Sequence, residues 1–109
     1  MDEIWRTRDI FDRVVYLSRV KLAHIRSRHK EFADRLVDIR STIEKPDFVA
    51  RHRLREHREC FYREEAPGKE LIKVIVHYRP IPPQGTWIGE VTTAFPVGLY
   101  RPKEVKLWP

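Results

Sequence analysis

Cysteine is nearly absent from this chain of 109 residues, in which Cys60 is the one thiol. An intrachain disulfide is therefore excluded, and a lone cysteine usually serves as a small apolar residue. Long apolar runs are also missing, since none approaches the roughly 20 residues that a membrane-spanning helix needs. The chain does not open with the segments of a secretory signal peptide. We therefore expect a reducing, cytoplasmic setting.

Acidic residues are missing from one stretch of the sequence. Between Arg13 and Lys30 the chain has six Lys or Arg, two His and no acidic residue, although the whole chain has sixteen Asp and Glu. This stretch coincides with the first long predicted helix. Basic charge and two proton carriers on one element indicate a site that handles phosphate.

The overall charge points in the same direction. The net charge is +6, the pI is about 9.8 and 35% of the residues are charged. Such a balance favours an anionic partner, which leaves nucleic acid, a membrane surface and an acidic protein open. The length suits one domain with one modest core, and no internal repeat or linker divides it. We therefore expect a single domain over residues 1–109, with residues 1–13 as an N-terminal arm.

Two helices are predicted in the first half of the chain. Ser18 is a natural N-cap for a helix over about residues 19–29. A second helix is predicted over about residues 33–44 from apolar residues at helical spacing, and Pro46 ends it.

The second half of the chain is rich in β-prone segments. Residues 71–79 alternate most clearly between two faces, and shorter strands are expected at 59–64 and 87–95. An edge strand at 48–53 and a docked terminal strand or hook at 105–108 complete the pattern. We therefore expect an α+β fold in which two N-terminal helices pack on one face of a roughly four-stranded antiparallel sheet.

His24 and Arg28 are the first candidates for chemistry. On a helix they lie about 40° apart, on one face, whereas His29 lies about 140° from His24. The two histidines therefore do not form an i, i+4 zinc pair, and no metal site is expected. A histidine that exchanges protons beside an arginine that binds phosphate suits RNA cleavage without metal. The alternative is that both are surface residues of a basic helix.

Further basic residues would bind the nucleic-acid backbone. The segment 51–58 has four Arg and two His in eight residues. It would hold phosphates electrostatically, or it would be a solvated loop or the guarded rim of an edge strand. Helix and strand residues would add to the field. The nucleic-acid-binding candidates are Lys21, Arg26, Arg51, Arg53, Arg55, Arg58 and Lys73.

Several short motifs occur in a characteristic order. They are Leu17-Ser18, His24-Ile25, Arg28-His29-Lys30-Glu31, the segment 42–47, Phe61-Tyr62-Arg63, the strand 71–78, Thr93-Ala94-Phe95 and Leu107-Trp108. In this order and spacing the chain resembles the phage-associated branch of the barnase–colicin–RelE-like nuclease superfamily, over residues 14–108. Two departures are Lys30, where the family has proline, and the proline-rich loop 80–85, which lengthens one hairpin.

The resemblance implies a nuclease-like core over 14–108 with a site between the helix and the sheet surface. It also implies metal-independent ribonuclease chemistry with no cofactor. The catalytic residues carried over are His24, Arg28, His29, Arg63 and Thr93. Many members of the superfamily are toxins or effectors held by a partner protein, such as an antitoxin or immunity protein, while others have lost activity.

The resulting hypothesis is an RNA-cleaving domain of prophage or toxin type. His24 would be the general base or acid, with His29 or Tyr62 as its partner. Arg28 and Arg63 would stabilise the phosphorane, Thr93 would hydrogen-bond the phosphate, and the product would be a 2′,3′-cyclic phosphate. The alternatives are a non-catalytic nucleic-acid-binding module and a protein-interaction module on the same basic face. The expected partners include no membrane, and the oligomeric state stays open.

Overall fold

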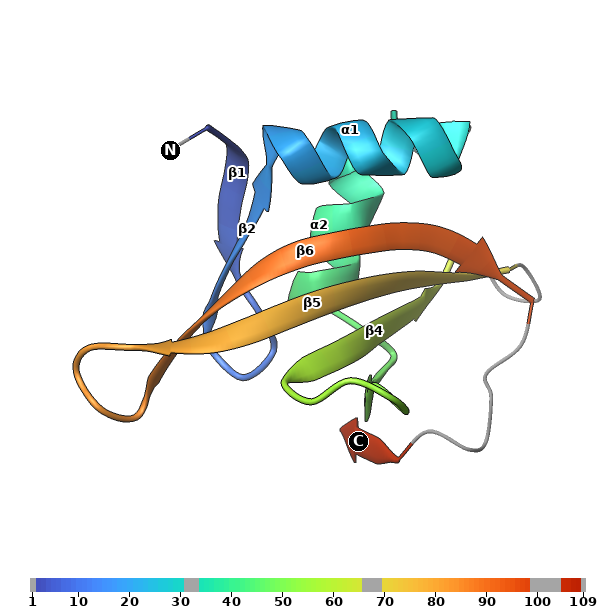
Figure 1. The fold of residues 1–109 in the computed structure, drawn as a ribbon. Helices are drawn as coiled ribbons and strands as arrows, with labels where there is room; N and C mark the ends of the chain where they lie inside the picture. The colour runs from blue at the N-terminus through green and yellow to red at the C-terminus, as the bar shows by residue number, and fades with distance from the viewer. Residues whose placement is uncertain (1, 31–33, 66–69, 99–104, 109) are drawn as a thin grey trace.

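The computed structural model describes residues 2–30, 34–65, 70–98 and 105–108, which form a seven-stranded sheet and two helices (Figure 1). In chain order the elements are β1 (Glu3–Arg8), β2 (Val14–Ser18), α1 (Arg19–Arg28), α2 (Leu36–Glu44), β3 (Phe48–Arg51), β4 (Arg58–Glu64), β5 (Leu71–Ile81), β6 (Thr86–Val97) and β7 (Lys106–Trp108).

The sheet has the strand order β1-β2-β6-β5-β4-β3-β7. β2 pairs with β6 in parallel, and all other neighbours are antiparallel. The expected four-stranded antiparallel sheet with two N-terminal helices is therefore wrong. Two strands precede the first helix, one of them lies within the expected arm 1–13, and the sheet is mixed.

The difference has a physical reason. The parallel pair places Val14 beside Ile88, and local alternation along β2 carries no information about so distant a partner. β1 is an edge strand whose outward residues include Arg6 and Arg8. Charges that guard an edge against further pairing also hide the strand pattern in the sequence.

Both helices form largely as their sequences predict. The Ser18 side chain accepts a hydrogen bond from the backbone N–H of Lys21 at 3.2 Å, which confirms the predicted N-cap. α1 ends where the backbone N–H of His29 donates to the carbonyl of Ile25. α2 ends before Pro46 as predicted, whereas its expected start at residue 33 lies outside the described residues, as does Glu31 of the helix-end motif.

The two helices pack on the same face of the sheet. Leu22 and Ile25 of α1 and Ile39 and Ile43 of α2 belong to one buried cluster with residues from β2, β4, β5 and β6. In Figure 1, β6 passes in front of α2, and α1 lies along β6. We call the opposite side of the sheet, which faces away from α2, the open face.

Alternation along the central strands assigns residues to the two faces. Val74, Val76 and Tyr78 of β5 belong to the cluster under the helices. The intervening Lys73, Ile75 and His77 therefore point to the open face. Ile75 there forms a second, smaller buried cluster with side chains from β3 and β4.

A buried polar network fixes the β1–β2 turn beneath β5. The Asp9 carboxylate accepts hydrogen bonds from the Tyr78 hydroxyl at 2.6 Å and from Arg13 Nε at 2.8 Å. Arg13 also forms an ion pair with Glu59 of β4 at 2.6 Å. Burial beside the Asp9 carboxylate raises the pKa of Tyr78 above its usual value. The network therefore links the β1–β2 turn to β4 and β5.

Candidate active site on the open face of the sheet

The candidate catalytic residues of α1, His24 and Arg28, are not buried against the sheet. His24 and Arg28 are exposed, and His24 points about 130° away from the direction of the buried Leu22 and Ile25. Lys21 and Arg28 are seven residues apart, so they lie within about 20° of each other on one flank of the helix. The charge of Lys21 lowers the pKa of His77, so Lys21 lies within electrostatic range of the open face.

His29 lies at the end of α1, where the helix reaches the sheet. Its ring stacks on Phe95 of β6, with ring centroids 5.0 Å apart and an interplanar angle of 24°. Phe95 is opposite Lys73 in the sheet register and belongs to the cluster on the open face. His29 therefore lies at the rim of the open face, whereas His24 does not.

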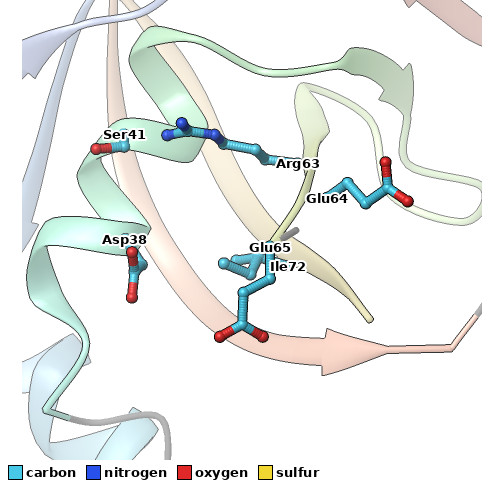
Figure 2. A pocket seen from close by; sticks show the side chains of 6 residues that line it. All are labelled: Asp38, Ser41, Arg63, Glu64, Glu65 and Ile72. Atoms are coloured by element: carbon cyan, nitrogen blue, oxygen red, sulfur yellow. The ribbon is translucent and has the colours of Figure 1, made fainter. Parts of the chain in front are cut away.

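Arg63 and Thr93 lie on opposite faces of the sheet. Thr93 is opposite Ile75 on the open face, whereas Arg63 is opposite Ile72, which belongs to the core under the helices. Arg63 lines a pocket of about 180 Å³ and reaches toward Ser41 of α2 (Figure 2). The other lining residues of that pocket are Asp38, Glu64, Glu65 and Ile72.

The Arg63 pocket is a poor place for a phosphate. Asp38 and Glu65 supply carboxylates to it, although both also pair with Arg35, at 2.8 and 2.9 Å. Like charges would repel an anion there. The sheet therefore separates Arg63 from Thr93, so these two residues of the expected site do not converge on one phosphate.

A row of polar side chains crosses the open face at the middle of the sheet. Arg58 of β4 is opposite His77 of β5, and His77 is opposite Glu90 of β6. Glu90 lies beside Tyr16 of β2. Directly opposite residues of antiparallel strands have Cβ atoms about 4.5–5.5 Å apart, which is close enough for their side chains to interact.

His77 lies in a partly buried and cationic environment. Burial lowers the pKa of His77 below its usual value, and the charges of Arg58, His57 and Lys21 lower it further, whereas Glu90 raises it. Its Nδ1 atom is buried and has no hydrogen-bond partner among the described residues. A histidine with an unoccupied ring nitrogen and a shifted pKa is typical of sites that transfer protons.

Ser18 positions Glu90. The Ser18 hydroxyl donates to Glu90 Oε2 at 2.9 Å, and its oxygen accepts from the backbone N–H of Lys21 at 3.2 Å. The residue that caps α1 therefore also holds the carboxylate opposite His77. The start of α1 also brings the charge of Lys21 within electrostatic range of His77.

Thr93 lies beside this row because β6 contains a bulge. The register advances from Ile75 opposite Thr93 to Val76 opposite Val91, so Thr92 is the extra residue. Thr92 donates its hydroxyl to the carbonyl of Ile75 at 3.1 Å. The Oγ1 atom of Thr93 is buried and lacks a hydrogen-bond partner within the described part of the chain. A ligand reaches this hydroxyl only after the atoms that cover it have moved aside.

The predicted basic residues divide into three groups. Arg58 is opposite His77, and the charge of Lys21 acts on His77. Lys73 lies over Tyr62 and Phe95 on the open face. Arg53 and Arg55 are exposed in the loop between β3 and β4. The remaining two are exposed away from the row, Arg26 on the other flank of α1 and Arg51 at the end of β3.

Tyr62 is poorly placed for proton transfer to solvent or substrate. Its side chain is only 1% exposed and its ring stacks on Phe48, with centroids 4.6 Å apart. It belongs to the apolar cluster of the open face. We therefore assign it a packing role beneath Lys73.

The described residues offer neither a metal site nor a membrane-spanning helix. Among the residues that it describes, no three His, Cys, Asp or Glu side chains are grouped so that they would hold a metal ion. Over the same residues, no helix is long and apolar enough to cross a membrane. Comparisons with protein-family models, with curated proteins and with solved structures find no match to this chain.

Sequence reasoning did not select His77 and Glu90 as catalytic candidates. The signal was present, because His77 interrupts the most apolar strand of the chain together with Lys73 and Arg79. Polar residues at alternate positions of such a strand indicate a face that is not core. Glu90 gave no comparable signal, since an isolated acidic residue in a strand is common at an exposed position.

Proposed function

We propose that this protein is a metal-independent endoribonuclease whose active site is the row on the open face. The observation that carries the proposal is that Arg58, His77 and Glu90 lie opposite one another on adjacent strands. The charge of Lys21 also acts on His77. An acid, a base and positive charge around one space are the parts that cleavage of RNA at its 2′-hydroxyl requires. The family resemblance of the sequence predicts the same activity, but through other residues, of which only Thr93 belongs to this site.

The roles follow from the chemistry of each group. Glu90 takes the proton of the 2′-hydroxyl, and the freed oxygen bonds to the phosphorus. The bond from phosphorus to the 5′-oxygen breaks, and His77 gives its proton to that oxygen. Arg58 and Lys21 stabilise the phosphorane, and Thr93 donates its hydroxyl to a phosphate oxygen. The products are a 2′,3′-cyclic phosphate and a 5′-hydroxyl.

The low pKa of His77 is compatible with its role as the acid. In the free protein burial disfavours the imidazolium most, and the charges of Arg58 and Lys21 add to this effect. A bound phosphate brings negative charge to the same space and favours the imidazolium again. A low intrinsic pKa also makes the imidazolium a better proton donor.

The test is incubation of the purified protein with total RNA and with a defined oligonucleotide in EDTA. Wild type is expected to produce ends with a 2′,3′-cyclic phosphate. His77→Gln and Glu90→Gln are each expected to reduce the rate by about 100-fold or more. Intact RNA, or equal cleavage by wild type and both variants, would overturn the proposal. Loss of cleavage with His24→Gln but not with His77→Gln would move the site to the outer side of α1.

A non-catalytic nucleic-acid-binding role is the second candidate. It is supported by the loop between β3 and β4, which carries exposed Arg53 and Arg55 next to the row. The loop is anchored, because the backbone N–H of Tyr78 donates to the carbonyl of His57 at 2.8 Å. This role predicts affinity that falls steeply with salt and no strand scission. An acidic partner protein, such as an antitoxin or immunity protein, would instead bind tightly and compete with RNA.

A further inference from the structure

We propose that a second row on the open face binds unpaired nucleotides of a single-stranded RNA, beyond the nucleotides at the scissile phosphate. This stacking row consists of Phe48, Tyr62, Lys73 and Phe95, with His29 at its end. Its position relative to the scissile phosphate rests on the function proposed above, whereas its capacity to bind RNA does not.

The sheet register builds the stacking row. Phe48 is opposite Tyr62, Tyr62 is opposite Lys73, and Lys73 is opposite Phe95. Phe48 stacks on Tyr62, and His29 of α1 stacks on Phe95. The partly exposed side chains of the row therefore come from β3, β5, β6 and the end of α1, and the buried Tyr62 supports them from beneath.

Cations accompany the rings. The Lys73 ammonium lies 5.2 Å from the centroid of Tyr62 and 6.0 Å from that of Phe95. Lys106 of β7 lies 4.9 Å from the centroid of Phe48. Glu64, two residues from Tyr62 on β4, is the nearest acidic residue along that strand on the open face. Partly exposed rings with lysines beside them combine a stacking surface for bases with positive charge for phosphates.

The geometry favours a single strand over a duplex or a peptide. In an RNA duplex the flat faces of the bases are covered by their neighbours, so aromatic side chains recognise unpaired bases. Phe48, Phe95 and His29 remain partly exposed, whereas Tyr62 is buried beneath them. An acidic peptide would satisfy the lysines but would not use the exposed rings.

The two rows are separated along the strands. Lys73 and His77 lie four residues apart on β5, which corresponds to about 13 Å. A dinucleotide that spans the scissile phosphate at His77 would not cover the stacking row, whereas a longer strand would. The row would therefore make the protein prefer long single-stranded substrates.

The test measures binding of 2′-O-methyl RNA, which lacks the attacking hydroxyl, by fluorescence anisotropy. Wild type is expected to bind an octamer much more tightly than a dinucleotide. Phe95→Leu, His29→Ala and Lys73→Met are each expected to reduce the ratio of the two affinities by about tenfold. Lys45→Met removes the same charge at the end of α2 and should leave the ratio unchanged. Circular dichroism establishes that each variant is folded, and His29→Ala tests the row if Phe95→Leu fails to fold.

The outcomes separate the two proposals. A reduced ratio in the row variants, without any cleavage of ordinary RNA by wild type, would leave the stacking row in place and remove the nuclease. Cleavage with unchanged ratios in the row variants would overturn the stacking row. Equal affinity for the octamer and for its duplex would also overturn it, as would an acidic peptide that binds with the same dependence on Phe95 and His29.

Discussion

The hydroxyl of Ser18 donates a hydrogen bond to Glu90 Oε2 at 2.9 Å, across the boundary between β2 and β6. Through the same oxygen, Ser18 caps α1. One short side chain therefore sets both the start of the helix and the position of the carboxylate that we propose as the base. This relationship gives the first prediction.

Ser18→Ala should affect stability and cleavage together. Loss of an N-cap costs about 1 kcal/mol, which urea unfolding would measure. Loss of the hydrogen bond to Glu90 should lower kcat more than it raises KM, because Ser18 positions the base and does not touch RNA. Ser18→Thr keeps the hydroxyl and should retain most of the cleavage rate. A variant Ser18→Ala with lower stability but unchanged kcat would contradict the positioning role.

The pKa of His77 should respond in opposite directions to its two neighbours in the row. Glu90 raises this pKa and Arg58 lowers it. Glu90→Gln should therefore lower the pKa of His77 further, and Arg58→Gln should raise it. Titration of the histidine resonances by NMR measures both shifts, and His77→Gln identifies the resonance. If the pKa of His77 shifts with the same sign in both variants, Glu90 and Arg58 do not act on His77 as proposed.

The same pKa shift makes stability depend on pH. The folded-state pKa of His77 lies below its usual value of 6.5, so the folded protein binds this proton less tightly than the unfolded chain does. The contribution of His77 to the free energy of unfolding is therefore present above pH 6.5, and it is lost as the pH falls through the folded-state pKa. His77→Gln should therefore show a smaller loss of stability between pH 7 and pH 5 than wild type in urea unfolding. An equally steep loss in His77→Gln would assign the pH dependence to other groups.

Arg63→Gln and Arg58→Gln should have different effects on RNA cleavage. Arg63 lies on the helix-covered side of the sheet in an acidic pocket, whereas Arg58 lies beside His77. Arg58→Gln should lower kcat/KM by about 10-fold to 100-fold, because it removes a charge near the phosphorane. Arg63→Gln should change kcat/KM by less than about twofold, because it removes the same charge outside the site. A larger loss of kcat/KM in Arg63→Gln than in Arg58→Gln would instead support the site expected from the sequence.

Gly89→Ala should destabilise the sheet. A Cβ atom at Gly89 would lie 2.6 Å from Val76 Cγ1 and 2.7 Å from Tyr78 Cε1. Such overpacking typically costs about 1–3 kcal/mol. Gly98→Ala is the matched control, because a Cβ atom there meets nothing within 4 Å. Thermal unfolding should show a lower midpoint for Gly89→Ala and little change for Gly98→Ala. Equal midpoints for the two variants would show that β5 and β6 can move apart.

Local signals predicted much of the secondary structure. The N-cap at Ser18, the end of α2 before Pro46 and the alternation along β5 each depend on residues that are close in sequence. These features follow from capping, from the geometry of proline and from the two-residue period of a strand. The parallel pairing of β2 with β6 depends on contacts between distant segments, and no local pattern indicates it.

The residues of the candidate site were likewise predicted only in part. The sequence correctly identified an acid-free helix and a strand with basic residues, but it did not indicate which side chains share a face. The prediction placed Arg63 and Thr93 at one phosphate site. The strand register puts Arg63 on the side of the core, away from Thr93. The bulge at Thr92 then leaves Thr93 on the open face, in a way that simple alternation from Glu90 does not reproduce.

The sequence by itself determined the chemical inventory of this protein: its basic charge, its histidines and the strands and helices that carry them. Only the tertiary structure decided which of these groups meet. His77 and Glu90 become neighbours because β5 and β6 pair in one register, and Lys21 joins them because Ser18 fixes the start of α1 beside β6. Composition and local period are properties of neighbouring residues, whereas the register between distant strands is set by the packing of the whole core.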